Sequence, residues 1–291
     1  MTKKKAKEPG KVKWMQRFFK VAGNIAPNTT IRILVKLLYT PRKREFKPDH
    51  IACMNKAETF KFEVDEFRNP KKKLKLQCYT WGEGEKTVLL VHGWDARAMD
   101  FYKMIPVLVE NGYKVIAFDG PGHGQSEGER SNLVDFKELM YALIKKKTGV
   151  PYAIIGHSMG GGAATYLLMD YDIRIKRLVT IAIPTISKRF FDGMFAAMKV
   201  PLRTQRTFYK SMEEEFGEPI EKYNLVERKE PIKADDILMV YDEDEDVVPY
   251  KDVKEFLARH PEIKTFNMRG IGHYRIIKNK QVIDEIIRFL K

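Results

Sequence analysis

Cysteine is scarce in this sequence, with only Cys53 and Cys78 among 291 residues. Two cysteines cannot build a disulfide framework, and no cluster of other metal-ligating residues accompanies them as a zinc site would require. This absence excludes the small disulfide-stapled class of protein and suits a reducing compartment. We therefore expect a cytoplasmic protein.

Long hydrophobic runs are also missing. No window approaches the roughly eighteen apolar residues that a membrane-spanning helix needs. Lys36 interrupts the stretch from Ile31 to Tyr39, so there is no clean apolar run of about 7–15 residues followed by a small-residue cleavage site. These absences predict a protein that is neither secreted nor transmembrane.

Acidic residues are scarce in the first 48 residues, which hold fourteen Lys or Arg but only Glu8 and Glu45. Residues 49–291 carry 39 basic and 37 acidic side chains, so most of the net charge of +14 lies in the N-terminal part. A concentrated positive segment favours anionic partners such as phospholipid headgroups or nucleic acid. It does not bear on the fold.

The basic N-terminal part, residues 1–58, carries a helical pattern. Its apolar residues recur at helical spacing, with basic residues off that stripe, and are Met15, Phe18, Phe19, Ala22 and Ile25. This pattern predicts an amphipathic helix that Pro27 closes, followed by a second helix or turn over about 30–39. We expect an arm that packs on the body of the protein. Contact with an anionic membrane is the second interpretation, and nucleic acid is the least favoured.

From residue 59 onward, short β-rich runs alternate with helix-length segments, as in a mostly parallel or mixed α/β sheet. The candidate strands cover 59–64, 74–81, 87–92, 114–118, 152–155, 178–183, 237–241 and 264–268. The helical stretches between and after them cover 98–111, 131–148, 159–170, 249–259 and 277–290. The first two strands alternate and suit an antiparallel edge, whereas several later ones are apolar on both faces and belong in the centre.

One interval breaks this alternation. Between about 184 and 235 lie some fifty residues of helical character, far more than a normal strand-to-helix connection of about 2–6 residues. An insertion of this size predicts a lid or cap. We therefore expect residues 59–291 to form one α/β domain that carries a cap.

The strongest local motif is Gly156-His157-Ser158-Met159-Gly160, which joins an apolar strand directly to a helix rich in small residues. A strand that turns abruptly into a helix strains its central residue, and glycine two positions away on each side lets the neighbouring backbone pass. The turn also puts the serine hydroxyl at a helix N-terminus, where free amides stabilise negative charge. We predict that Ser158 is a catalytic nucleophile.

A serine nucleophile needs a base, almost always a histidine that a carboxylate orients. Five of the six histidines are poorly placed, in the elbow, in glycine-rich loops before it, in the arm linker or at a helix end: His50, His92, His123, His157 and His260. His273 follows a strand and precedes the last helix, which fits the chain order serine, acid, histidine. His273 is therefore the predicted base.

Acyl transfer also needs two amide donors aimed at the oxyanion. One belongs to the residue after the nucleophile, which is Met159. The other comes from a loop after an earlier strand, and strand 87–92 ends in His92-Gly93-Trp94. Trp94 is the best candidate for this second donor.

The acid must lie between the serine and the histidine, at the end of the strand DILMVY. Five carboxylates follow one another there: Asp242, Glu243, Asp244, Glu245 and Asp246. They repel one another, so most must face water while one is drawn to the imidazole. The residues themselves do not decide which one that is.

These elements, together with the segment DGPGHGQSEG at Asp119–Gly128, make the chain resemble the α/β-hydrolase superfamily over roughly residues 60–291. The His-Gly, Gly-x-Ser-x-Gly and final Gly-His motifs occur in the order and at the approximate spacing of that family. The resemblance implies an eight-stranded, mostly parallel sheet flanked by helices. It also implies a nucleophile after the fifth strand and a small helical cap after the sixth.

The resemblance also bears on the acid. In that family the acid loop commonly reads Gly-x-x-Asp-x-x-Val-Pro, and an ungapped alignment of YDEDEDVVP puts Glu245 on the acid. Asp244 then falls on a frequent non-catalytic aspartate. The resemblance therefore implies Glu245, in place of the usual aspartate, with Asp244 as the next choice and Asp246 as the third.

Relatives of this fold that act on haloalkanes and epoxides attack with aspartate. The serine at this position therefore favours acyl compounds as the substrate class. We predict a serine hydrolase of the esterase or lipase-like kind, which cleaves a small-molecule carboxylic ester or thioester through an acyl-enzyme and needs no cofactor or metal. The alternatives are a catalytically silent binding protein of this fold and a membrane-surface adaptor that acts through the basic arm. The expected location is cytoplasmic, peripheral to the inner face of the membrane if the arm binds lipid. The oligomeric state and the acyl chain length do not follow from the sequence.

Overall fold

The computed structural model describes residues 10–67 and 69–291. The chain forms two compact units. One, the α/β unit, consists of Tyr39–Thr185 and Lys229–Lys291. The other, the helical unit, combines the chain up to Leu38 with Ile186–Arg228.

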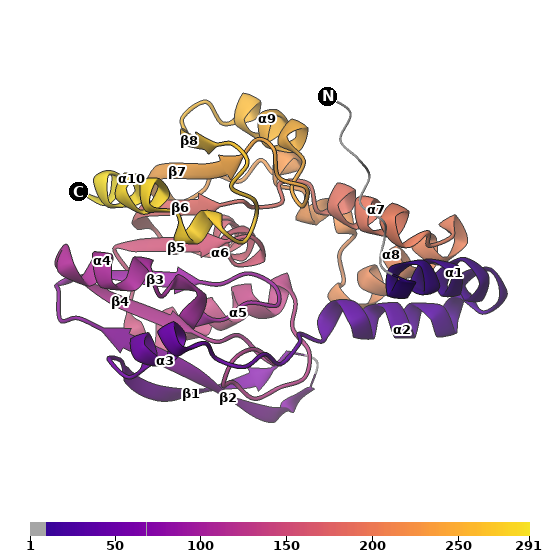
Figure 1. The fold of residues 1–291 in the computed structure, drawn as a ribbon, viewed down its shortest axis with the longest axis horizontal. Helices are drawn as coiled ribbons and strands as arrows, with labels where there is room; N and C mark the ends of the chain where they lie inside the picture. Colours follow the sequence, from indigo (N-terminus) through magenta and orange to yellow (C-terminus); the bar gives the residue numbers. More distant parts are fainter. Residues whose placement is uncertain (1–9, 68) are drawn as a thin grey trace. The chain divides into compact units, whose positions relative to one another are not determined.

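The α/β unit is built on one eight-stranded sheet in the order β1-β2-β4-β3-β5-β6-β7-β8 (Figure 1). β2 pairs antiparallel with β1 and β4, and the remaining neighbours are parallel. The strands are β1 Glu58–Glu66, β2 Asn69–Trp81, β3 Lys86–Val91, β4 Tyr113–Phe118, β5 Ala153–His157, β6 Ile175–Ile181, β7 Ala234–Asp242 and β8 Lys264–Met268. All eight predicted strands are present, so the predicted fold class is confirmed.

Helices cover both faces of this sheet. The face that α4 and α10 cover packs every second residue of the central strands against them, because strand side chains alternate between faces. α5 and α6 contact each other and lie behind the sheet in Figure 1. The helices of this unit are α3 Pro48–Met54, α4 Met104–Glu110, α5 Leu133–Leu143, α6 Met159–Asp170, α9 Tyr250–Arg259 and α10 Lys280–Leu290.

Short helical turns account for the differences from the predicted helices of the α/β unit. The predicted helix 98–111 is a 3₁₀ turn over Ala98–Phe101 followed by α4, and the predicted helix 131–148 ends in a π turn over Ile144–Thr148. β6 ends at Ile181 because Ala182 adopts a φ of 52°, which strand geometry does not allow. These differences do not move the ends of the strands that carry the site.

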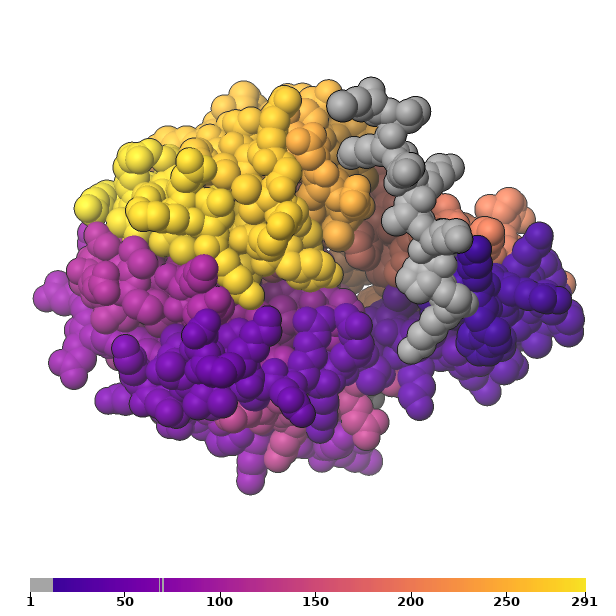
Figure 2. Space-filling model, in the orientation of Figure 1, coloured from indigo at the N-terminus to yellow at the C-terminus, as the bar shows by residue number. Residues whose placement is uncertain are grey.

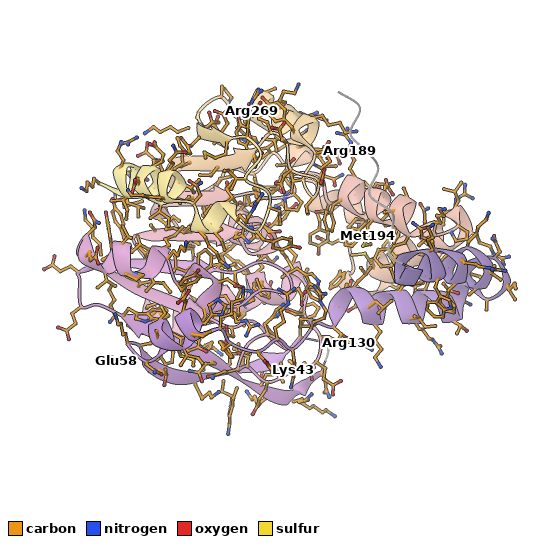
Figure 3. The ribbon with its side chains drawn as sticks, in the orientation of Figure 1. Lys43, Glu58, Arg130, Arg189, Met194 and Arg269 are labelled. Atoms are coloured by element: carbon orange, nitrogen blue, oxygen red, sulfur yellow. The ribbon has the colours of Figure 1, made fainter. Side chains whose placement is uncertain are left out.

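The helical unit contains α1 Gly10–Ile25, α2 Pro27–Tyr39 as far as Leu38, α7 Ser187–Met198 and α8 Leu202–Phe216. Its core draws on all four helices, on the link between α7 and α8 and on the turn that follows α8: Phe19, Ile31, Leu34, Phe195, Val200, Phe208, Met212 and Ile220. Met194, labelled on α7 in Figure 3, packs against this core. The aromatic and Met side chains of the insertion are thus largely core packing.

Two hydrogen bonds connect the N-terminal helix to the insertion. Gln16 Nε2 donates to the carbonyl of Ala197 at 2.9 Å, and Thr204 Oγ1 donates to the carbonyl of Gly23 at 2.8 Å. A Cβ on Gly23 would lie 2.7 Å from Pro201 Cδ, so only glycine fits there. Segments that the sequence analysis treats as two parts, 1–58 and 184–235, therefore contribute helices to the same core.

Among residues 10–67 and 69–291, no helix combines the length and the apolar character that crossing a bilayer requires.

Candidate active site

Ser158 sits at the junction between β5 and α6. Its φ of 51° and ψ of −125° lie outside the regions that side-chain-bearing residues prefer. The backbone around it is held by two hydrogen bonds, from Ser158 N to the carbonyl of Ile181 and from Gly162 N to the carbonyl of Ser158. The strained turn that the Gly-x-Ser-x-Gly motif predicts is therefore present.

The two glycines of the motif are required by close backbone contacts. A Cβ on Gly160 would lie 2.2 Å from the carbonyl oxygen of His92, and a Cβ on Gly156 would lie 2.4 Å from Gly161 Cα. Both obstacles are backbone atoms, which cannot swing aside as a flexible side chain can. This crowding explains why a sharp strand-to-helix turn needs a small residue two positions before and after its centre.

His273 lies in the loop after β8, and its imidazole is within hydrogen-bond distance of both Ser158 and Glu245. His273 Nε2 is 2.9 Å from Ser158 Oγ, and His273 Nδ1 is 2.6 Å from Glu245 Oε2. A carboxylate only accepts hydrogen bonds, so Nδ1 carries the hydrogen and Nε2 is free to accept from the serine hydroxyl. Ser158 and His273 are both buried, at 9% and 6% exposure.

The carboxylates of the acidic loop lie in different environments, as their mutual repulsion leads us to expect. The Glu245 side chain is 1% exposed and faces the imidazole, whereas Asp244 and Asp246 are exposed to solvent. Glu243 pairs with Arg269, which follows β8 and is labelled in Figure 3. The structure thus brings Ser158, His273 and Glu245 together and leaves the two alternative acids outside.

Asp242, the last residue of β7, is the fifth of these carboxylates, and the sequence analysis did not identify its role. Its carboxylate is buried and accepts hydrogen bonds from the backbone amides of Asp244, Gly270 and Gly272 at 2.7–3.0 Å. Burial alone would raise the pKa of Asp242, but these amide hydrogen bonds outweigh it and hold the pKa below its usual value. Asp242 therefore ties the acid loop to the loop that carries His273.

The predicted oxyanion donors lie on the two segments that meet at Ser158. Met159 is the first residue of α6, and the first amides of a helix have no partner within it. A Cβ on Gly93 would lie 3.0 Å from Ser158 Cβ, so the backbone that leads into Trp94 passes beside Ser158. Met159 and the segment that leads into Trp94 thus lie next to Ser158, and their role as oxyanion donors stays a prediction.

His92 orients the peptide that links Gly93 to Trp94. Its Nδ1 lies 2.7 Å from the Gly93 carbonyl oxygen, and its Nε2 accepts from Gly120 N at 2.9 Å, so the hydrogen is on Nδ1. The C=O and N–H of a trans peptide point in opposite directions. Fixing the Gly93 carbonyl therefore also fixes the direction of the Trp94 amide.

Asp95 secures the other side of the same loop. This residue has a φ of 55°, and its carboxylate bonds to Arg42 N at 2.8 Å and Nε at 2.7 Å. The Nη2 atoms of Arg42 and Arg44 contact it as well. Burial alone would raise the pKa of Asp95, but the two arginines hold it below its usual value. Residues from the chain before α3 thus anchor the loop that carries Trp94, a contact that no local motif signals.

His92, His123 and His157 are buried in the α/β unit in neutral form. Burial lowers the pKa of His123 to about 4 and that of His157 to about 3, and it places the pKa of His92 well below its ordinary value. His157 Nε2 lies 2.9 Å from the carbonyl oxygen of His273. None of the three is placed to act as the base.

We expect these histidines to make the fold sensitive to mild acid. In the unfolded chain each titrates near 6.5, so below that pH the unfolded state binds protons that the folded state does not. Their contribution to stability is present above about pH 6.5 and is lost as the pH falls towards the folded pKa values. The free energy of unfolding should fall by about 2 kcal/mol per buried histidine between about pH 7 and pH 5.

Urea unfolding, followed by tryptophan fluorescence at both pH values, checks this expectation. His123→Gln keeps an acceptor for the amide of Asp95 and should reduce the pH dependence, whereas His260→Gln at the end of α9 should not. A stability that stays constant between the two pH values would contradict the assignment of neutral buried histidines.

In the described residues, no three His, Cys, Asp or Glu side chains are grouped so that they could hold a metal ion. Cys53 and Cys78 are both buried and unbonded, and burial raises their pKa values to about 11 and about 12. These thiols are therefore protonated and carry no nucleophilic role.

A family model described as the α/β hydrolase fold matches residues 86–218, which run from β3 through the serine elbow into the insertion. A serine hydrolase-like protein of Danio rerio is 28% identical over 185 residues, covering 60% of this chain and 54% of that protein. A 2-hydroxy-6-oxononadienedioate/2-hydroxy-6-oxononatrienedioate hydrolase of Escherichia coli is 30% identical over 131 residues, covering 42% and 45%. The chain thus spans about half the length of these curated relatives.

Solved structures resemble the chain over a larger share of its length. An esterase from Pyrococcus furiosus superposes with a TM-score of 0.60 at 21% identity, covering 87% of this chain and 96% of that one. The mouse α/β hydrolase domain-containing protein 10 superposes with a TM-score of 0.62 at 15% identity, covering 80% and 97%. At such low identity, these matches show a shared fold.

Proposed function

Because the chain belongs to the α/β-hydrolase superfamily, we propose that it is a serine hydrolase that cleaves carboxylic ester or thioester bonds through a covalent acyl-enzyme. The observation that carries this proposal is the line of hydrogen bonds from Ser158 through His273 to Glu245. A serine that only shaped the turn would need neither a base at hydrogen-bond distance nor a buried carboxylate behind that base.

In the first half of the proposed reaction, Ser158 Oγ attacks the acyl carbon while His273 Nε2 accepts the hydroxyl proton. Glu245 remains ionised and stabilises the imidazolium that forms. The amides of Met159 and Trp94 donate hydrogen bonds to the oxyanion. His273 then passes its proton to the departing alcohol or thiol as the bond from the acyl carbon breaks, which leaves the acyl group on the serine.

The second half repeats these roles with water. His273 Nε2 accepts a proton from a water molecule as the water oxygen attacks the acyl carbon, and the same amides hold the oxyanion. The bond to Ser158 Oγ breaks, the serine regains its proton from His273, and the carboxylic acid leaves. Each step moves protons only between groups of this chain, the substrate and water.

A panel of p-nitrophenyl esters of graded chain length, with acyl thioesters alongside, tests this proposal. Turnover of any of them, together with covalent labelling by a fluorophosphonate probe, is the expected result. A long-chain optimum would point to lipid-derived acyl groups, and a short-chain or flat profile would argue against them. A folded protein that neither turns over esters nor takes the label would contradict the proposal.

The Asp95 contacts yield a separate prediction about the oxyanion loop. Asp95→Asn keeps a residue that tolerates positive φ but removes the charge that holds Arg42 and Arg44. We expect kcat to fall by roughly 10- to 100-fold with KM nearly unchanged. The amide donates to the oxyanion of the transition state, so loosening it weakens transition-state stabilisation and leaves substrate binding almost unaffected. Steady-state kinetics on the best ester of the panel measures both constants.

Two variants make this measurement interpretable. Arg42→Gln removes the partner from the other side and should lower kcat in the same way, whereas Asp172→Asn, an exposed aspartate after α6, should leave kcat unchanged. A rise in KM at constant kcat would show that the contact serves substrate binding and not the oxyanion loop.

A further inference from the structure

Among the described residues, the helical unit exposes more large hydrophobic side chains than the α/β unit does. In the described part of the chain, ten large hydrophobic side chains are exposed, and six of them belong to the helical unit although it is the smaller of the two. The six are Trp14, Val21, Ile25, Ile33, Leu37 and Leu202. Scattered exposed apolar residues are ordinary, but a concentration of them indicates an interaction site.

Helix α1 has two apolar faces and not one. Phe19 is 1% exposed and belongs to the core of the helical unit. Trp14, Val21 and Ile25 lie at i, i+7 and i+11, which places them along one side of the helix, and they are 67%, 52% and 79% exposed. The sequence analysis places Ile25 in the same stripe as Phe19, and this is wrong, because Ile25 is exposed. It belongs to a second row that faces outward.

Basic residues accompany this outward row. Lys13, Arg17 and Lys20 are exposed on α1 and lie on the side of the row away from the core. From Gly10 to Leu38 the chain contains no acidic residue at all, and four further lysines precede it at positions 3, 4, 5 and 7. The outward side of α1 thus combines one aromatic and two aliphatic side chains with positive charge alone.

The neighbouring helices repeat this combination. Leu202 begins α8 and is 69% exposed, and the contacts of Pro201 and Thr204 with Gly23 put it at the C-terminal end of α1. On α2, Ile33 and Leu37 are one turn apart and exposed, with Arg32 and Lys36 exposed beside them. The helices coloured indigo reach the surface of the helical unit in Figure 2.

We propose that this outward face of the helical unit binds the surface of an anionic lipid bilayer. Interfacial helices carry Trp and aliphatic residues that enter the headgroup region, with Lys and Arg that reach the phosphates. The α1 row has both components on one exposed side. The bound state is peripheral, with the folded helical unit lying on the headgroups, and it does not depend on the chemistry at Ser158.

Other occupants fit this face less well. In a symmetric dimer the basic rows of two copies would meet without any acidic residue of α1 or α2 to balance them. The phosphates of a nucleic acid would pair with the lysines and arginines, but Trp14, Val21 and Ile25 would remain in water. A bilayer with anionic headgroups matches the charge and also removes the apolar row from water.

The experiment is co-sedimentation of the full-length chain with vesicles of phosphatidylcholine alone or mixed with phosphatidylglycerol, at an ionic strength of about 0.15 M. We expect binding to the mixed vesicles and much weaker binding to phosphatidylcholine. On binding, tryptophan emission should move to shorter wavelength, because Trp14 leaves water while Trp81 is already buried. Trp14→Phe should keep the binding and lose the emission shift.

Two triple variants separate the apolar and the electrostatic contributions. Trp14→Gln/Val21→Gln/Ile25→Gln should weaken binding by at least about tenfold, since the apolar row supplies the inserted surface. Lys13→Gln/Arg17→Gln/Lys20→Gln should weaken it by about fivefold for each charge removed. The substituted side chains are exposed and glutamine is a good helix former, so circular dichroism should show an unchanged fold.

The matched controls come from the α/β unit. Ile51→Gln/Phe67→Gln/Val150→Gln removes three other exposed apolar side chains, and Lys71→Gln/Lys103→Gln/Lys229→Gln removes three other exposed charges. Both should bind vesicles as the wild type does.

Several results would overturn the proposal. A wild type that stays in the supernatant with anionic vesicles would do so, and so would an apolar triple variant that binds unchanged. A dimer that the apolar triple variant dissociates, without vesicle binding by the wild type, would assign the face to self-association. Salt-sensitive DNA binding without vesicle binding would assign it to nucleic acid. Esterase turnover of the unbound protein, measured in parallel, is independent of each of these outcomes.

Discussion

Ser158→Ala should lower kcat for ester hydrolysis by a factor on the order of 10⁴ or more. Alanine removes the only atom that can form the acyl-enzyme, and the oxyanion amides and substrate binding alone account for the small rate that remains. Labelling by a fluorophosphonate should disappear completely, because this probe reacts with an activated serine hydroxyl. Kinetics on p-nitrophenyl esters and gel detection of the probe measure the two effects.

The fold should survive this substitution. Alanine keeps the Cβ, so the strained backbone at φ 51° is neither relieved nor worsened, and only one hydrogen bond to His273 is lost. Ser211→Ala, on α8, provides a control in which turnover and labelling should both be retained. A Ser158→Ala protein that still takes the probe would show that another residue is the nucleophile.

Glu245→Gln should lower kcat by roughly 10³- to 10⁴-fold with a small effect on KM. The Glu245 carboxylate holds the hydrogen of the imidazole on Nδ1 and stabilises the imidazolium that forms when Ser158 attacks. An uncharged amide cannot stabilise that cation, and its NH₂ group can impose the opposite tautomer of His273. Steady-state kinetics on the best ester of the panel, at a pH where the wild type is fully active, measures the loss.

The neighbouring carboxylates serve as matched controls for this substitution. Asp244→Asn and Asp246→Asn change exposed side chains of the same loop and should leave kcat within a few-fold of the wild type. Glu245→Asp should give an intermediate rate, because the charge is kept while the reach to His273 is shortened. Loss of activity in Asp244→Asn with a nearly normal Glu245→Gln would instead identify Asp244 as the acid.

Several features of this site could be predicted because they depend on residues that are close in the sequence. The elbow around Ser158 needs a strand, a glycine on either side and a helix within a dozen residues, and all of these are visible in one segment. The eight strands could be recognised because their apolar patterns are short and separated by clear helical segments. His273 could be chosen by elimination because the sequence has so few histidines.

Other features escaped prediction because they depend on segments far apart in the sequence. Asp95 is held by arginines that lie about fifty residues earlier, and nothing in the local sequence of either segment indicates the contact. Asp242 looks like one more acid in a run of five, and only its hydrogen bonds to the amides of Gly270 and Gly272 distinguish it. Long-range contacts of this kind have no periodicity that a local pattern could reveal.

Sequence and tertiary structure determine different features of this protein. The sequence by itself determined the strand-and-helix order, the serine elbow and the scarcity of acidic residues in the first 48 positions, since each is a property of contiguous residues. Tertiary structure decided which carboxylate meets the imidazole, since only folding buries Glu245 while Asp244 stays in water. It also decided which apolar side chains of α1 enter a core and which remain outside, because burial depends on the partner helices α7 and α8 and not on the pattern of α1 alone.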